Sequence, residues 1–317
     1  MNDTPATPAP MSMPVSASGP SAPDTGALRT AAELRDHGVR ALAAAQVPTP
    51  DADAELLLAH VLGIGRGQVQ ARIVAGAEVA QADRDAYLAA VARRGAREPL
   101  QHITGVAPFR SIELAVGPGV FVPRPETETV AQIAIDALQA VAAAEPLAID
   151  LGTGSGAIAL ALATEVPHAR VIGVERSAEA FAWAQRNAER IGAANVRIVL
   201  GDLADALPEL DGVVDLVISN PPYIPDEAIP RDPEVRLFDP ALALYGGSDG
   251  LDVVRTISHR ARELLRPGGT LVLEHGELQG AEIRALLTAD GWRAAATTRD
   301  LLGRDRATTA LRPPRVE

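Results

Sequence analysis

The chain has 317 residues, of which 47% are hydrophobic and 22% charged, which is the balance of an ordinary globular protein with room for one large and one smaller domain. It contains no cysteine, which excludes disulfides, thiolate metal sites and a cysteine nucleophile. Its formal net charge of −12 argues against tight binding along a nucleic-acid backbone, which requires clustered Lys and Arg. No apolar run approaches the roughly 18 residues that cross a bilayer, and the basic-then-apolar pattern of a secretory signal is absent. We therefore expect a cytoplasmic protein that makes no membrane contact.

The first part of the chain predicts a disordered tail followed by a small all-helical domain. Residues 1–26 are almost entirely Ala, Pro, Ser, Thr and Gly, and such a segment buries too little apolar surface to offset its ordering entropy. Residues 27–97 have helical patterning. Within them, the segment TPD that begins at Thr49 supplies a capping hydroxyl and a proline at the first helical position, and Gly63 ends that helix. A further helix is expected at about residues 80–94.

A linker with strand character is expected at residues 98–125. Its stretch ITGVAPFRSIELAVGPGVFV alternates apolar and polar residues around turn signals, which predicts a β-hairpin. The segment FVPRPETETV then leads into a helix at about residues 126–144, whose first turn carries acids that suit the helix dipole.

Residues 126–317 are expected to form the main domain, in which strands and helices alternate. Because this order requires crossover connections, it predicts a parallel sheet with helices on both faces. Two shorter segments, WRAAATTRD and ATTALR, predict an antiparallel pair at its edge, which makes a seven-stranded α/β sheet. The buried strands are PLAIDLG, ARVIGVE, VRIVLGD, VVDLVISN and GTLVLEHG, and the helices expected between most of them are at residues 157–165, 178–191, 251–265 and 279–290.

Three glycines stand between the first of these strands and its helix. Gly152, Gly154 and Gly156 allow a tight turn and let the backbone approach a ligand at the positive end of the helix. Glu175 closes the second strand about twenty residues on, where a carboxylate accepts hydrogen bonds from ribose hydroxyls. We expect a nucleoside-containing cofactor, but the spacing also fits a relaxed dinucleotide fingerprint, so a nicotinamide dehydrogenase stays open here. Asp202, after the third strand, has two equal interpretations, an acceptor for an adenine amino group or a turn-capping aspartate.

The fourth strand ends in the tetrapeptide Asn220-Pro221-Pro222-Tyr223. Ligands of an open parallel sheet bind beyond the carboxyl ends of its strands, so the tetrapeptide and the glycine loop are expected to face one cleft. Pro221 restricts the backbone of Asn220, and the Asn220 side-chain oxygen and the Pro221 carbonyl are two acceptors for a planar –NH₂ group. Tyr223 can lie against the face of that group. The segment therefore predicts a clamp for an sp² nitrogen, such as that of an amide, adenine, cytosine or guanine.

Such a nitrogen is a weak nucleophile, and holding its two hydrogens in the plane directs what remains of its lone pair at an electrophile. A sulfonium methyl is a suitable electrophile, because its transfer needs in-line approach and no activating metal, and positioning supplies much of the barrier reduction. A hydride-transfer enzyme has no use for this clamp, so methyl transfer is favoured over the dehydrogenase. The histidines and acids show no metal-ligand spacing, and we predict no metal.

The segments AIDLGTGSG, GVERS, LGDL and SNPPY, in this order, resemble the S-adenosylmethionine-dependent methyltransferases with a seven-stranded, Rossmann-like sheet, and NPPY is similar to that of their amino-methylating group. The blocks EPLQHITGVAPF, FVPRPETE, EVRLFDPALALYGGSDGL and LEHG resemble the release factor glutamine N5-methyltransferases, the PrmC or HemK family. The resemblance covers about residues 28–313. It implies S-adenosylmethionine as the methyl donor. It also implies, as acceptor, the glutamine amide of the Gly-Gly-Gln motif of class I peptide chain release factors, and so a role in translation termination.

The resemblance further implies a role for each part of the site. The glycine loop would hold the methionine part of the cofactor, Glu175 its ribose, and the segment after the third strand its adenine, while the tetrapeptide would clamp the glutamine amide. The helical domain would dock the release factor, and a monomer is expected. Glu175 stands where aspartate is common in the family, and Leu203 where some members have an aromatic residue beside the adenine. The implied cofactor-binding residues are Gly152, Thr153, Gly154, Ser155, Gly156, Glu175, Asp202, Leu203 and Asn220, and the implied catalytic residues are Asn220, Pro221, Pro222 and Tyr223.

A few further side chains and two rival functions complete the predictions. His275 and Glu274, at the end of the fifth strand, are expected to be structural or to line the cleft, and His102 to be a linker histidine. Arg124 and Glu126 border the cofactor cleft or cap a helix, with neither interpretation favoured. One rival is an amino-methyltransferase of nucleic-acid bases, which the acidic charge disfavours. The other is a non-catalytic S-adenosylmethionine-binding protein.

Overall fold

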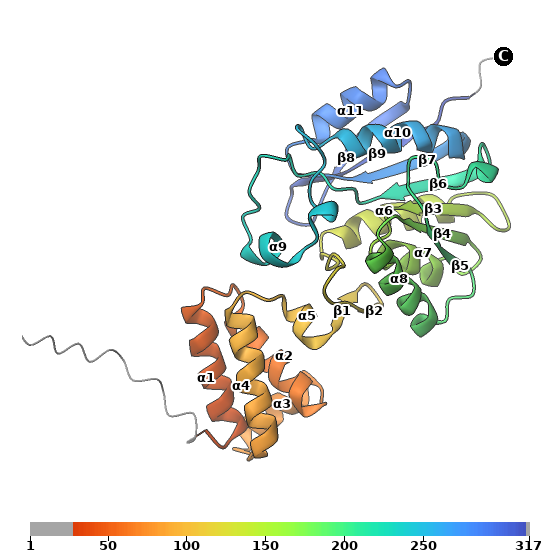
Figure 1. Cartoon of the computed structure of the whole chain (residues 1–317). Helices are drawn as coiled ribbons and strands as arrows, with labels where there is room; N and C mark the ends of the chain where they lie inside the picture. Colours follow the sequence, from red (N-terminus) through yellow and green to blue (C-terminus); the bar gives the residue numbers. More distant parts are fainter. Residues whose placement is uncertain (1–27, 315–317) are drawn as a thin grey trace, which may run out of the picture.

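The computed structural model describes residues 28–314, and the tail predicted at residues 1–26 lies outside them. The described chain begins with a helical domain (Figure 1). Its core consists mainly of leucines, alanines and valines with one tyrosine, and Leu34, Leu57 and Tyr87 in it are fully buried. Its four helices are α1 Ala31–Ala44, α2 Pro50–Leu62, α3 Arg66–Val74 and α4 Gln81–Gly95. The all-helical domain predicted from the sequence is therefore present.

The ends of helix α2 confirm two predicted features and contradict a third. Pro50 occupies the first turn and Gly63 ends the helix in the left-handed conformation with φ of 63°, as predicted. The predicted Thr49 cap is wrong, because its side chain accepts no bond from a helix N–H. The Thr49 hydroxyl instead donates to the buried carboxylate of Asp53 over 2.9 Å. That carboxylate also accepts from Arg94, so the Thr49 hydroxyl bonds a member of this tertiary ion pair and not an N–H group of its own helix.

A short helix and a hairpin connect the helical domain to the main domain. Helix α5, Leu100–Thr104, ends at Gly105, and strands β1, Val106–Phe109, and β2, Ile112–Ala115, pair antiparallel as the sequence predicts. Asn187 ties this hairpin to the main domain, because its amide exchanges hydrogen bonds with the backbone of Ala115 at 2.7 and 3.0 Å.

The main domain contains the predicted seven-stranded mixed sheet, with the strand order β5-β4-β3-β6-β7-β9-β8. The first five strands of this order are parallel, and β9 and β8 form the antiparallel edge. The first strand of the domain, β3, lies between β4 and β6, so the chain reverses direction across the sheet at that strand. The strands are β3 Leu147–Leu151, β4 Arg170–Glu175, β5 Val196–Leu200, β6 Val214–Ser219, β7 Leu265–Glu274, β8 Arg293–Arg299 and β9 Asp305–Leu311.

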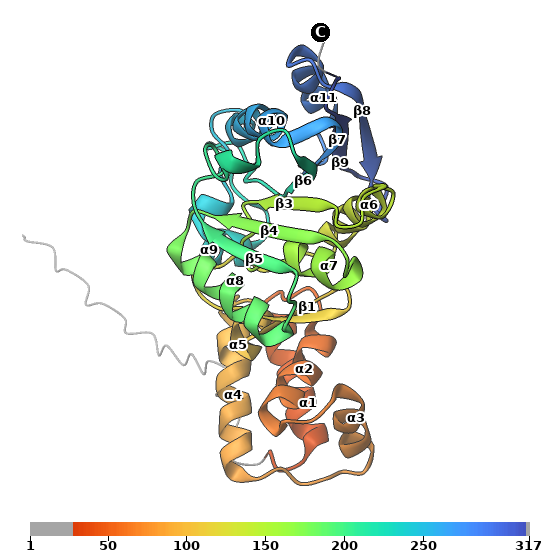
Figure 2. The same cartoon turned by 90° about the vertical axis from the view of Figure 1, so that its right-hand side faces the viewer.

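Helices cover both faces of the sheet (Figure 2), as the alternation of strands and helices predicts. One face packs against α6 Thr127–Gln139, α7 Ala157–Glu165 and α8 Ala178–Ile191, and the other against α10 Asp252–Leu264 and α11 Gly280–Ala289. Helix α6 is shorter than the predicted 126–144, since it ends at Gln139 and a turn and bends connect it to β3. None of the described helices is both long and apolar enough to cross a membrane.

The two domains are joined by an ion-pair cluster as well as by the linker. Glu234 of the short helix α9, Pro233–Phe238, accepts bonds from Arg94 at 2.9 Å and from Arg97 at 2.6 and 2.9 Å. Burial works to raise the pKa of Glu234, but the hydrogen bonds from Arg97 and Arg94 outweigh it and hold the pKa below its ordinary value of 4.5. The segment between β6 and α10, which carries α9, is thereby fixed to the helical domain.

We expect the Glu234→Ala variant to lower the free energy of unfolding by about 1–2 kcal/mol at neutral pH, because Arg97 then loses its carboxylate partner. A carboxylate with a lowered pKa contributes stability above its unfolded pKa and loses it as the pH falls. The difference from the unmodified protein should therefore shrink below about pH 4.5. Urea unfolding at several pH values measures both effects. Glu227→Ala, an exposed position on the same segment, is the matched control, and an equal loss in it would contradict the assignment.

Candidate active site

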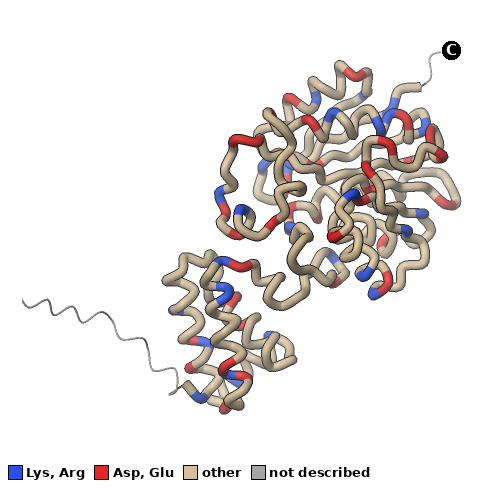
Figure 3. Tube along the Cα trace, viewed as in Figure 1, with Lys and Arg blue, Asp and Glu red and all other residues tan. Residues whose placement is uncertain are grey.

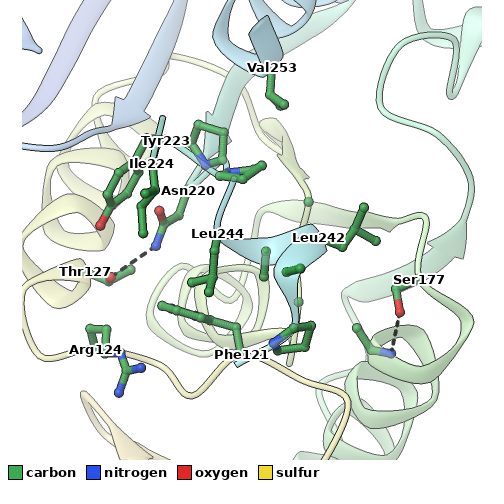
Figure 4. A pocket seen from close by; sticks show the side chains of 18 of the residues that line it. Phe121, Arg124, Thr127, Ser177, Asn220, Tyr223, Ile224, Leu242, Leu244 and Val253 are labelled. Carbon is green, nitrogen blue, oxygen red and sulfur yellow. Dashed lines mark hydrogen bonds between the residues drawn. The ribbon is translucent and has the colours of Figure 1, made fainter. Parts of the chain in front are cut away.

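A cleft of about 1340 Å³ opens at the carboxyl ends of β3, β4 and β6. Figure 4 shows side chains from distant segments around it, with Phe121 and Arg124 on one side and Asn220 and Tyr223 on another. All but one of the residues predicted from the sequence to bind a cofactor or clamp an amide line this one cleft. They are Gly152, Thr153, Gly154, Ser155, Glu175, Asp202, Leu203, Asn220, Pro221, Pro222 and Tyr223. The one predicted residue that does not line the cleft is Gly156, which is the N-cap of α7.

The glycine loop adopts a conformation that its sequence requires. Gly152, Gly154 and Gly156 have φ of 78°, 57° and 87°, a region that residues with a side chain rarely adopt. A Cβ added at Gly152 or Gly154 would meet nothing within 4 Å, so the space next to these two glycines is open. Beneath the loop, Asp150 accepts bonds from the Thr153 hydroxyl at 2.6 Å and from a helix N–H at 3.2 Å. Burial raises the pKa of this Asp150 carboxyl to about 7.

Glu175 fixes the shape of the glycine loop. One of its carboxylate oxygens accepts from the Gly154 N–H and the other from the Ser177 N–H, both at 2.8 Å. Each oxygen retains a lone pair for a further donor, and the residue lines the cleft. Glu175 is one methylene longer than the aspartate common in the family, and this length lets it bridge the two backbone N–H groups. Its contact with a ribose stays a prediction.

Asp202 and Leu203 line the cleft after β5, which β4 and β3 separate from the strand that precedes the tetrapeptide. The Asp202 carboxylate accepts from the Ala204 N–H at 2.9 Å, which is the turn interaction that was one of its two interpretations. Leu203 is half-buried and packs against the core on the α10 side of the sheet. Their contact with an adenine stays a prediction.

The tetrapeptide after β6 is held from several directions. The Asn220 Nδ2 donates to the Thr127 hydroxyl over 3.4 Å, and its side-chain oxygen is directed away from Thr127 (Figure 4). The Tyr223 carbonyl accepts from Gln279 at 3.0 Å, and Ile224 exchanges backbone bonds with residues 244 and 246. Burial first, and the neighbouring Glu274 carboxyl second, raises the pKa of Tyr223 to about 12, so its phenol is neutral at physiological pH.

Gly246 is expected to be essential for the position of the tetrapeptide. A Cβ at this buried position would stand 2.4 Å from the Pro222 carbonyl oxygen and 2.7 Å from that of Gly250. Gly246→Ala should therefore displace Pro222, lower turnover at least about tenfold and cost about 1–3 kcal/mol of stability. Steady-state kinetics and thermal unfolding measure both. Gly67→Ala, where a Cβ meets nothing within 4 Å on an exposed helix, is the control, and unchanged turnover in Gly246→Ala would contradict the expectation.

The structure resolves the side chains that were left with two interpretations. Arg124 lines the cleft, pairs with the buried Asp239 and lies 4.8 Å from the centre of the Phe121 ring. Glu126 lines the cleft and stands at the N-terminal end of α6, without a side-chain capping bond. His275 is structural, because it is buried and its ring nitrogens bond Thr308 and the Gly276 carbonyl at 2.9 Å.

Within residues 28–314, no three His, Cys, Asp or Glu side chains are grouped as metal ligands would be.

Sequence reasoning missed Thr127 and undervalued Glu274. Both are buried, at 3% and 1% exposure, and both lie next to Asn220; Thr127 also lines the cleft, whereas Glu274 does not. The PRPETE segment drew attention to the start of α6, but nothing in its residue pattern indicates that Thr127 reaches the end of β6, 93 residues along the chain.

The chain is similar to known methyltransferase sequences over most of its length. A family model described as the PrmC N-terminal domain matches residues 33–105, and one described as a methyltransferase domain matches residues 147–299. A model described as protein-L-isoaspartate(D-aspartate) O-methyltransferase matches residues 78–212.

Curated relatives match nearly full length. A release factor glutamine methyltransferase of Streptomyces coelicolor is 53% identical over 85% of this chain and 93% of the relative. One from Bifidobacterium longum is 46% identical over 88% of this chain and 95% of the relative. A 4-amino-L-phenylalanine/4-methylamino-L-phenylalanine methyltransferase of Streptomyces pristinaespiralis is 41% identical over 91% of this chain and 97% of the relative.

Proposed function

We propose that this chain, which belongs to the release factor glutamine methyltransferase family, transfers a methyl group from S-adenosylmethionine to a glutamine side-chain amide. The acceptor we propose is the glutamine of the Gly-Gly-Gln motif of class I peptide chain release factors. The observation that carries the proposal is that the glycine loop and the tetrapeptide Asn220-Pro221-Pro222-Tyr223 line one cleft, in which the Asn220 side-chain oxygen accepts no hydrogen bond from residues 28–314.

The cofactor end of the cleft fits S-adenosylmethionine. The open space beside Gly152 and Gly154 suits the methionine part, and Glu175 has acceptor capacity for the ribose hydroxyls. Asp202 and Leu203 line the same cleft, and we assign the adenine to them. When bound, this cofactor supplies an electrophilic sulfonium methyl group.

The acceptor end of the cleft fits a planar primary amide. The Asn220 oxygen and the Pro221 carbonyl can each receive one N–H of the glutamine amide, which fixes the orientation of its nitrogen. Tyr223 stays neutral and so can cover the face of the amide without introducing a charge. The chain thus contributes orientation and the exclusion of water.

The helical domain is proposed to dock the release factor. Its connection to the cleft supports this role, because Arg94 and Arg97 hold the segment that carries Glu234, and that segment also lines the cleft. Acidic and basic residues are intermixed over both domains (Figure 3), which fits a protein partner better than a nucleic-acid backbone.

One assay separates this function from its alternatives. The protein is incubated with radiolabelled S-adenosylmethionine and, in separate reactions, release factor, its Gly-Gly-Gln glutamine-to-alanine variant, total RNA, total DNA and free 4-amino-L-phenylalanine. We expect label only on the unmodified release factor. Labelling of nucleic acid or of the free amine instead, equal labelling of both release factors, or cofactor binding without any labelling would overturn the proposal.

A further inference from the structure

Three side chains from three separate elements meet at the Asn220 end of the amide clamp. Thr127 is the first residue of α6, Asn220 follows β6, and Glu274 is the last residue of β7. The Asn220 Nδ2 donates to the Thr127 hydroxyl, and both side chains face the Glu274 carboxyl, where they favour its ionised form. Glu274 is 1% exposed and does not line the cleft, so it can act on a substrate only through its neighbours.

The orientation of the Asn220 amide decides whether the clamp works. A primary amide presents two donors on one side and an acceptor on the other, and a rotation of about 180° exchanges them. A bound –NH₂ group needs the oxygen on the cleft side, with Nδ2 turned toward Thr127. The flipped amide would present N–H groups to N–H groups, which repel each other.

We propose that Thr127 and Glu274 are positioning residues that hold the Asn220 amide in the orientation that presents its oxygen to the substrate. An ionised carboxylate only accepts hydrogen bonds, so Glu274 selects the inward direction for Nδ2, and the Thr127 hydroxyl receives that donor directly. This inference rests on the proposed function, because it takes the glutamine –NH₂ as the group that the Asn220 oxygen receives.

The ionisation state of Glu274 determines how strongly it favours the Asn220 amide orientation in which Nδ2 points toward Thr127. Arg306 of β9 favours the ionised form, while Glu126 and Tyr223 are the other titratable groups that face the carboxyl. Burial is the largest effect and raises the pKa of Glu274 to about 7. Its Oε2 has no hydrogen-bond partner within the described chain, so a proton there is free to donate to a flipped Asn220 oxygen. Turnover should therefore rise with pH through about 7, as Glu274 ionises.

The test compares variants of the first positioning residue. Thr127→Val keeps the shape but removes the acceptor for Nδ2, and we expect kcat to fall about tenfold while KM for S-adenosylmethionine stays within about twofold. Thr127→Ser restores the hydroxyl and should recover kcat to within about twofold of the unmodified enzyme. Thr164→Val is the matched control, because its hydroxyl bonds only the backbone of α7 and lies outside the cleft.

Glu274→Gln tests the second positioning residue through the pH profile. It keeps the size of the side chain but cannot ionise, so the rise of kcat near pH 7 should disappear. Normal kcat in Thr127→Val, no recovery in Thr127→Ser, or a pH rise that persists in Glu274→Gln would overturn the inference. These outcomes differ from failure of the proposed function, in which the unmodified enzyme methylates no release factor.

Discussion

Replacing Asn220 with alanine is expected to lower kcat about 10²-fold or more, while the affinity for S-adenosylmethionine changes little. The variant loses the acceptor that we propose fixes one N–H of the glutamine amide, so the nitrogen lone pair is no longer aligned with the methyl group. Its main effect should fall on kcat rather than on KM for the cofactor, because the orientation matters most in the transition state. Single-turnover and steady-state methylation of release factor measure it.

A loss of stability must be separated from this loss of turnover. Asn220→Ala removes the partly buried hydrogen-bond partner of the buried Thr127 and so costs about 1–3 kcal/mol of stability. Asn195→Ala is the matched control, because its amide bonds the carbonyls of Ala163 and Ala169 at 3.0 and 2.9 Å, away from the cleft. We expect it to lose similar stability and keep its kcat. Near-normal turnover of Asn220→Ala, or an equal loss in both variants, would contradict the assigned role.

The architecture of the main domain could be predicted because its signals are local. The strands read as apolar runs and the helices between them as separate segments, so the alternation alone predicts the parallel sheet and its covered faces. The prediction that VRIVLGD is a buried strand is wrong, because β5 lies at the edge of the sheet and its residues are partly or fully exposed. The errors occur where tertiary contacts override local rules. Thr49 is a residue type that commonly caps helices, but its hydroxyl bonds Asp53, which Arg94 of another helix holds in place.

The site was predictable only in part, for the same reason. The glycine loop and the Asn-Pro-Pro-Tyr segment are recognisable because several specialised residues stand together in the sequence. The groups that hold them in place are single residues with distant partners. Thr127 meets Asn220 across 93 positions, Arg124 meets Asp239 across 115, and Arg94 meets Glu234 across 140. No short pattern encodes such pairs, so the fold is needed to find them.

Replacing Glu175 with glutamine is expected to raise the Kd for S-adenosylmethionine about 10²-fold and to leave kcat at saturating cofactor nearly unchanged. The carboxylate is proposed to receive both ribose hydroxyls, and a hydrogen bond to a charged group contributes about 1.5–3 kcal/mol, where 1.4 kcal/mol is about tenfold in affinity. Glutamine keeps one acceptor but turns an –NH₂ group toward either Gly154 or Ser177, whose N–H groups now bond the carboxylate. The variant should therefore also loosen the glycine loop.

Calorimetric titration of S-adenosylmethionine measures this change, with Glu189→Gln on the exposed side of α8 as the control for a lost surface charge. The comparison with Asn220→Ala is the stronger test, because the two residues line one cleft from different strands, Glu175 at the end of β4 and Asn220 after β6. If the cofactor and acceptor ends are assigned correctly, Glu175→Gln raises Kd and spares kcat, whereas Asn220→Ala lowers kcat and spares Kd. An unchanged Kd in Glu175→Gln would contradict the ribose assignment. A fall in kcat of the same size in both variants would mean that the glycine loop and the tetrapeptide act as one unit, so that binding and orientation cannot be assigned to separate residues.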